Sequence, residues 1–90
     1  MNPILHNEMH HRFEMQVNGK MNFLQYIPIR DGMEITHTEV DRELEGNGYG
    51  AELAKHALDY AKEHQLRIVP SCPFVKVFLI RHPEYEKLIA

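Results

Sequence analysis

The chain contains one cysteine and no tryptophan, and no run of apolar residues approaches the ~18 that a membrane-spanning helix needs. The single thiol, that of Cys72, has no partner within the chain, which is typical of proteins from a reducing compartment. The N-terminus also lacks the apolar core of a signal peptide. We therefore expect a cytoplasmic protein that does not interact with membranes.

Basic residues are not in excess, because 10 Lys and Arg stand against 13 Asp and Glu and the net charge is −3. A charge of this sign provides no broad field to attract nucleic acid. Metal-ligand spacing is missing as well: His6, His10 and His11 lie in an N-terminus that we expect to fray, and no cysteine or spaced carboxylates complete a site. We expect neither nucleic acid nor a metal ion as a partner.

Length and hydrophobic content predict a single domain over residues 1–90. The chain has 90 residues, of which 43% are hydrophobic, enough for one core but not for two. Residues 13–17 alternate between apolar and polar side chains as a strand does, and Asn18-Gly19 suits a type I′ hairpin turn. Residues 20–29 are apolar on both faces around Phe23-Leu24, which predicts a central strand or a bulge.

A third strand is predicted for residues 33–40, after a tight turn at Arg30-Asp31-Gly32. Strict alternation places Met33, Ile35 and His37 on one face of this strand. His37 is therefore expected to share a side with apolar neighbours.

Three alternating glycines, Gly46, Gly48 and Gly50, follow this strand and precede an amphipathic helical pattern. Glycine lets successive backbone N–H groups point into one concavity, and the start of a helix adds unpaired donors. The pattern predicts an anion-binding loop, with a plain flexible turn as the alternative. A short strand at Ile68-Val69 then completes a βαβ crossover.

The C-terminal part is punctuated by prolines. Pro73 suits the first position of a helix, where its missing N–H would be unpaired in any case. Residues 74–80 fit either a helix or a strand, and Tyr85, Leu88 and Ile89 indicate a last helical turn.

Four segments in order make the chain resemble the small single-domain GNAT-like N-acetyltransferases: His37-Thr38-Glu39-Val40, the glycine loop, Pro70-Ser71-Cys72-Pro73-Phe74-Val75 and His82-Pro83-Glu84-Tyr85. The resemblance extends from about Phe13 to Leu88. It implies an α+β fold, with a twisted and mostly antiparallel sheet, one main helix after the glycine loop and short C-terminal helices. It also implies acetyl-CoA as the acetyl donor and an amine as the acceptor, either a small molecule or a protein lysine.

The resemblance assigns the CoA pyrophosphate to the backbone of the glycine loop and the pantetheine arm to the end of the preceding strand. The residues so assigned are Glu39, Val40, Gly46, Asn47, Gly48, Tyr49 and Gly50. The chain departs from the family pattern at Glu45, where Arg or Gln is usual. Because a carboxylate within ~4 Å of a phosphate costs about 1 kcal/mol even at the dielectric constant of water, we expect Glu45 to turn toward solvent or Arg42.

Cys72 and His37 are the candidate catalytic residues. A cap position before Pro73 would expose the thiol of Cys72 to helix N–H groups that favour a thiolate. The resemblance implies that Cys72 accepts the acetyl group while His37 acts as a base. In the alternative route the amine attacks acetyl-CoA directly, and Cys72 only lines the pocket. A buried structural cysteine and a structural histidine on a strand face are the non-catalytic interpretations.

Three classes of function remain open. The first is an acetyltransferase, and the second is a module that binds acetyl-CoA or CoA without turnover. The third is an interaction domain that uses its glycines only to reverse the chain.

Overall fold

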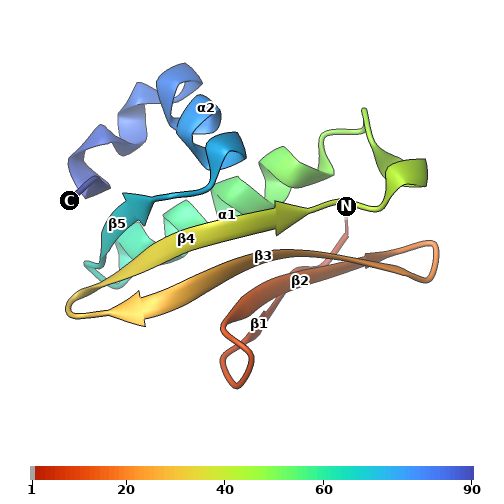
Figure 1. The fold of residues 1–90 in the computed structure, drawn as a ribbon, viewed down its shortest axis with the longest axis horizontal. Helices are drawn as coiled ribbons and strands as arrows, with labels where there is room; N and C mark the ends of the chain where they lie inside the picture. Colours follow the sequence, from red (N-terminus) through yellow and green to blue (C-terminus); the bar gives the residue numbers. More distant parts are fainter. Residues whose placement is uncertain (1) are drawn as a thin grey trace.

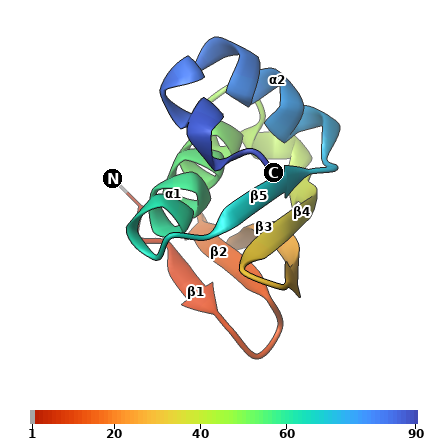
Figure 2. The same ribbon diagram turned by 90° about the vertical axis from the view of Figure 1, so that its left-hand side faces the viewer.

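The computed structural model describes residues 2–90, which form one five-stranded sheet with helices on one side (Figures 1 and 2). Neighbouring strands follow the chain in the order β1-β2-β3-β4-β5. The first four are antiparallel, and β5 is parallel to β4. The strands are β1 (Leu5–Asn7), β2 (Arg12–Val17), β3 (Lys20–Ile29), β4 (Gly32–Glu39) and β5 (Arg67–Pro70). This is the predicted α+β fold with a mostly antiparallel sheet.

Two α-helices and two short 3₁₀-helices complete the fold within residues 2–90: η1 (Arg42–Leu44), α1 (Tyr49–Glu63), α2 (Pro73–Arg81) and η2 (Pro83–Leu88). Figure 2 shows α1 against one face of the sheet, with α2 above it near β5. The ambiguous residues 74–80 are therefore helical, and the last turn after Pro83 is confirmed as a 3₁₀-helix.

The local turn chemistry confirms the predicted hairpin and central strand. Asn18 and Gly19 both adopt positive φ, at 51° and 75°, as a type I′ turn requires. They join β2 to β3, and β3 is the middle strand of the sheet. Only one of its two apolar faces is covered, because Ile27 on the open face is 50% exposed.

The N-terminal segment is ordered by an aromatic cluster, and the prediction that it frays is wrong. β1 pairs with β2, and the His6 ring stacks on Phe13 with centroids 4.2 Å apart. Its Nε2 lies 2.6 Å from the hydroxyl of Tyr26. Burial, with a further contribution from nearby histidines, lowers the pKa of His6 despite the opposing charge of Glu8. The hydrophobic pattern of the sequence could not reveal this order, because it depends on contacts between residues far apart in the chain.

A β-bulge in β4 reverses the predicted side of His37. Gln25 pairs with His37 and the next residue, Tyr26, pairs with Ile35, so Thr36 is an extra residue without a partner. Beyond the bulge, Thr38 pairs with the fully buried Leu24 and faces the helices. His37 consequently points to the open face, and the expectation that it shares a side with Met33 and Ile35 is wrong.

Helix α1 supplies the apolar layer that covers the sheet. Its buried side chains recur at helical spacing, as predicted, and contact the inward side chains of β2, β3 and β4. The buried members are Leu53, Ala54, Ala57, Leu58 and Ala61. They belong to one hydrophobic core with the inward strand residues and with Val75, Phe78 and Leu79 of α2. The small alanines let the helix lie close to the sheet.

β4 and β5 start together and then separate. At the start, a Cβ on Gly32 would overlap the carbonyl oxygen of Arg67, so this pair of strands approaches closely only because Gly32 has no side chain. The last paired residues are Ile35 and Pro70. The chain then turns away into α2, and the amides of Ser71 and Cys72 both donate to the carbonyl of Ile35, at 3.0 and 2.9 Å.

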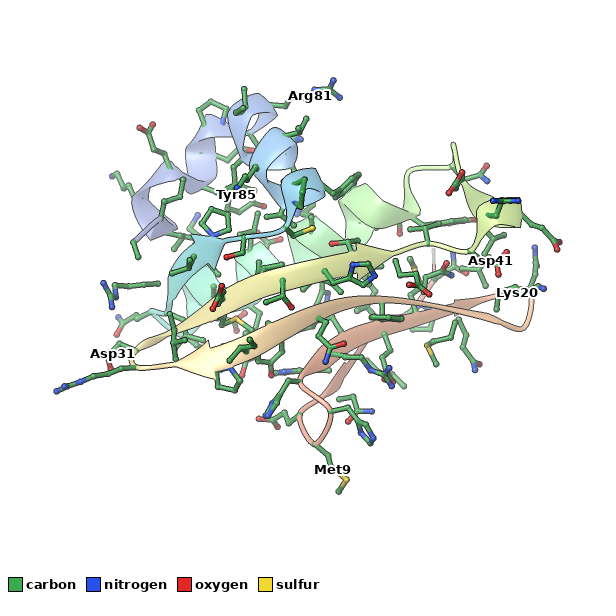
Figure 3. All side chains as sticks on the ribbon, viewed as in Figure 1. Met9, Lys20, Asp31, Asp41, Arg81 and Tyr85 are labelled. Carbon is green, nitrogen blue, oxygen red and sulfur yellow. The ribbon has the colours of Figure 1, made fainter. Side chains whose placement is uncertain are left out.

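The buried side chain of Tyr85 in η2, labelled in Figure 3, connects the C-terminal part of the chain to α1. The hydroxyl of Tyr85 donates to Asp59 at 2.6 Å, and Lys55 pairs with the same carboxylate at 2.8 Å. Burial opposes ionisation of Asp59, but these two hydrogen bonds outweigh it and lower the pKa of Asp59. Desolvation, followed by the bond to Asp59, raises the pKa of Tyr85 to about 12.

Among residues 2–90, none of the helices combines the length and apolar character that crossing a bilayer requires. The same residues contain no group of three or more His, Cys, Asp or Glu side chains placed to hold a metal ion.

The raised pKa of Tyr85 predicts a loss of stability at alkaline pH. The unfolded chain releases the phenol proton near pH 10 and the folded protein near pH 12, so the free energy of unfolding falls as the pH rises through this window. Tyr85→Phe should remove this component and cost about 1–2 kcal/mol at neutral pH. Urea denaturation across the pH range measures both effects. Tyr60→Phe, whose hydroxyl makes no hydrogen bond within residues 2–90, is the control, and equal slopes in all three proteins would contradict the assignment.

Candidate functional site

A cavity of about 680 Å³ lies between the end of β4, the glycine loop and α2. One wall is the outer part of β4, a second is the loop with the first turn of α1, and the third is one stripe of α2. Its lining comprises Thr38, Glu39, Val40, Leu44, Glu45, Gly46, Gly48, Tyr49, Gly50, Ala51, Phe74, Val77, Phe78, Arg81 and His82. The cavity is therefore built where β4 and β5 have separated.

The outer part of β4 offers an unpaired strand edge to this cavity. β5 pairs with β4 only from Gly32 to Ile35, while β4 continues to Glu39. Beyond Ile35 the edge that faces α2 has no neighbouring strand within residues 2–90. Backbone N–H and C=O groups on such an edge can pair with an extended ligand that carries amides.

The glycine loop presents backbone donors to the same cavity. Gly46 and Gly48 adopt positive φ, at 86° and 81°, with open space where a Cβ would stand. Gly48 caps α1 without a side-chain hydrogen bond, and the first helical bond runs from the amide of Glu52 to the carbonyl of Gly48 at 3.0 Å. The amides of the first turn are thus free to bind an anion, and the helix dipole favours negative charge there.

The wall formed by α2 changes from apolar to cationic along its length. Phe74, Val77 and Phe78 line the cavity, with Phe74 45% and Val77 48% exposed. A Cβ on Gly50 would lie 2.9 Å from the ring of Phe74, so the two helices meet closely at this glycine. Arg81, one turn further along α2, ends the stripe with a positive charge. An extended apolar ligand with an anionic end matches this wall.

Six of the seven residues assigned to the donor line the cavity: Glu39, Val40, Gly46, Gly48, Tyr49 and Gly50. Asn47 does not line it, because its side-chain amide donates to the carbonyl of Leu44 at 2.9 Å and closes the turn. Glu45 is exposed and also lines the cavity, and it makes no ion pair with Arg42 within the described chain. Of the two expected directions, the structure gives the one toward solvent.

Cys72 is the N-cap of α2 and Pro73 is its first residue, as predicted. The thiol makes no capping hydrogen bond and is only 3% exposed. Its sulfur lies 3.5 Å from the hydroxyl of Thr38, which lines the cavity. Cys72 is therefore directly behind the cavity wall rather than in it.

His37 lies on the other face of β4 and does not approach Cys72. Its imidazole Nε2 is 3.1 Å from a carboxylate oxygen of Glu39, and its side chain is 56% exposed. The ring of Phe23 is 5.9 Å away, centroid to centroid. Because a carboxylate only accepts hydrogen bonds, a neutral His37 donates from Nε2 and keeps its lone pair at Nδ1. The structure thus pairs His37 with Glu39, while Cys72 is paired with Thr38.

Sequence reasoning missed three elements of the site: Thr38 beside the thiol, the apolar stripe of α2 and Arg81. The spacing of Phe74, Val77, Phe78 and Arg81 is a helical one that a firm helix assignment would have revealed. No local pattern indicated that Thr38 faces the helices, because its orientation depends on the bulge at Thr36.

Comparison with known proteins agrees with this architecture. The model of a family described as GCN5-related N-acetyl-transferase matches residues 12–88. Protein NATD1 of Bos taurus is 29% identical over 82 residues, covering 87% of this chain and 72% of its own length. Protein NATD1 of Danio rerio is 26% identical over 90 residues, covering 93% and 81%. The mouse protein of that name is 27% identical over 82 residues, covering 87% and 74%.

The burial of Cys72 predicts a protected thiol. A soluble disulfide reagent should modify Cys72 at least ~100-fold more slowly in the native protein than in urea, because reaction requires local opening at the start of α2. Absorbance of the released thiolate gives both rates. Cys72→Ala, which has no other cysteine, supplies the blank. Equal rates in the folded and unfolded protein would show that the thiol is open to solvent.

Proposed function

The chain belongs to the GCN5-related N-acetyltransferase family, and on that premise we propose that it transfers the acetyl group of acetyl-CoA to a primary amine. The observation that carries this proposal is the cavity that joins the glycine loop to the unpaired edge of β4. Binding of acetyl-CoA would use both features together, since the donor is an anion at one end and an amide-rich arm at the other.

The residues present fit acetyl-CoA. The free amides from Gly46 to Gly50 would hold the pyrophosphate, each charge-assisted hydrogen bond contributing about 1.5–3 kcal/mol. The edge of β4 at Glu39 and Val40 would pair with the amides of the pantetheine arm, and the α2 stripe would cover its apolar parts. The open space at Gly46 and Gly48 leaves room for the phosphates to approach the backbone.

When bound, acetyl-CoA supplies an activated acetyl group: attack by the amine nitrogen forms an amide bond, breaks the carbon–sulfur bond and releases CoA as a thiolate. In this proposal His37 takes the proton that the amine nitrogen loses, at the Nδ1 that its contact with Glu39 leaves free. The acceptor therefore approaches from the open face of the sheet, where no helix of residues 2–90 stands in its way (Figure 2).

Direct transfer is the route that the geometry favours. His37 and Cys72 lie on opposite faces of β4, so His37 is not placed to deprotonate the thiol in an acetyl-cysteine route. Cys72 instead fixes Thr38 and the cavity wall. The exposed His37 and Glu39 also suit an acceptor with a positive charge, such as a protonated small amine or a lysine side chain.

Replacement of a loop glycine tests the donor site. Gly48→Ala should cost about 1 kcal/mol of stability through its positive φ and weaken acetyl-CoA binding roughly tenfold, because the loop amides shift. Gly19→Ala is the matched control, with φ of 75° and the same open surroundings. It should lose the same stability and no affinity in calorimetric titrations. Equal affinities of the two variants for acetyl-CoA would show that the loop is not part of the donor site.

Loss of the base tests the chemistry. His37→Gln should lower kcat about 100-fold or more while leaving the affinity for acetyl-CoA unchanged. CoA release is measured with a panel of small amines, polyamines and lysine peptides. His10→Gln, an exposed histidine in the β1–β2 turn, is the control. Full activity of His37→Gln would remove the histidine from the mechanism, and saturable binding of acetyl-CoA without release across the panel would identify a binding module instead.

A further inference from the structure

The cavity lining carries the negative charge of Glu45, and Arg81 is the cation that could offset it beside a bound anion. Glu39 and Glu45 both belong to the lining, but the carboxylate of Glu39 is paired with His37 on the open face at 3.1 Å. His82 is engaged by Glu84 at 3.5 Å. Arg81 is the only other cationic side chain in the lining. Within residues 2–90 it makes no ion pair. Without Arg81, an anion at the glycine loop would meet the carboxylate of Glu45 with no free cation in the lining to offset it.

Arg81 belongs to the same helix that forms the apolar wall, and it lines the cavity together with the loop. It follows Phe74 and Val77 on one stripe of α2, at helical spacing. Figure 3 shows Arg81 at the end of α2, with its side chain extending outward at the edge of the molecule. Both Arg81 and the loop residues Glu45, Gly46 and Gly48 line the cavity.

We propose that Arg81 binds the diphosphate of acetyl-CoA and supplies, from α2, the cation that the loop lacks at Glu45. This inference rests on the proposed function. A guanidinium presents several N–H donors in a planar fork and binds phosphate oxygens in pairs. It also offsets the carboxylate of Glu45, so the loop retains its anion site despite the acidic residue.

A structural role for Arg81 makes a different prediction. A cation in the last turn of α2 stabilises the helix through its dipole. That role affects every ligand of the cavity equally, through the stability of α2. Recognition of the diphosphate instead affects only ligands that contain it, and the effect decreases with salt.

Titration calorimetry on the full chain separates the two roles. Arg81→Gln should weaken binding of acetyl-CoA and of 3′-dephospho-CoA about tenfold each, and leave binding of pantetheine unchanged. The difference should shrink at high salt. Arg30→Gln, an exposed arginine in the β3–β4 turn, should bind all three as the parent protein does. The double variant Glu45→Arg, Arg81→Gln should recover the lost affinity.

Four results would overturn the inference. Unchanged affinity of Arg81→Gln for acetyl-CoA would leave the proposed function intact and remove Arg81 from the site. An equal loss with pantetheine would assign Arg81 to the stability of α2. If Arg81→Gln bound acetyl-CoA more weakly than the parent protein but bound 3′-dephospho-CoA equally well, Arg81 would contact the 3′-phosphate and not the diphosphate. Failure of the parent protein to bind acetyl-CoA would reject the proposed function together with the inference.

Discussion

The carbonyl oxygen of Ile35 is the point on which the site depends. It accepts both the Ser71 and the Cys72 amides, at 3.0 and 2.9 Å, immediately after the last pair of β4 and β5. These two bonds satisfy the backbone where the chain leaves the sheet, so β5 can end while β4 continues. The edge of β4 is thereby left free, and α2 begins at a fixed place beside it. The cavity is the space between that edge and that helix.

The bulge at Thr36 adds a second consequence at the same position. One extra residue in β4 exchanges the two faces of the strand, so Thr38 joins the covered side and His37 the open side. The covered side holds Cys72 and the donor cavity, whereas the open side holds the His37–Glu39 pair. A reaction that needs a donor and a base would use both faces of one strand, which keeps the acceptor apart from the phosphates.

Local patterns were sufficient to predict the hairpin at Asn18-Gly19, the amphipathic helix after the glycines, the βαβ crossover and Cys72 as a helix cap. Each of these depends on residues that are close together in the sequence. The apolar run of residues 20–29 indicated a bulge as one alternative, and the register does shift at Gln25 and Tyr26. The extra residue at Thr36, the ordering of His6 and the position of Arg81 were not predictable in this way. They arise from partners far along the chain: His6 meets Tyr26, Thr38 meets Cys72, and Arg81 reaches the loop cavity through α2. Six of the seven residues that the resemblance assigns to the donor line one cavity, but the side of the strand on which His37 lies required the pairing of β3 with β4.

The separation of β4 and β5 after Ile35 also determines how charge is distributed around the cavity. Because Cys72 is held to β4, the nine residues of α2 act as a rigid spacer, about 13 Å long at ~1.5 Å per residue. Arg81 stands at its far end, and Tyr85 then anchors the following turn to Asp59 at 2.6 Å, so both ends of the helix are fixed. The backbone that carries Arg81 is therefore ordered before an anion binds, in contrast to that of a flexible loop, and only the side chain has to be immobilised. In the proposed complex an acidic residue at position 45 is tolerable, since the compensating charge of Arg81 would come from an element whose place the sheet itself determines.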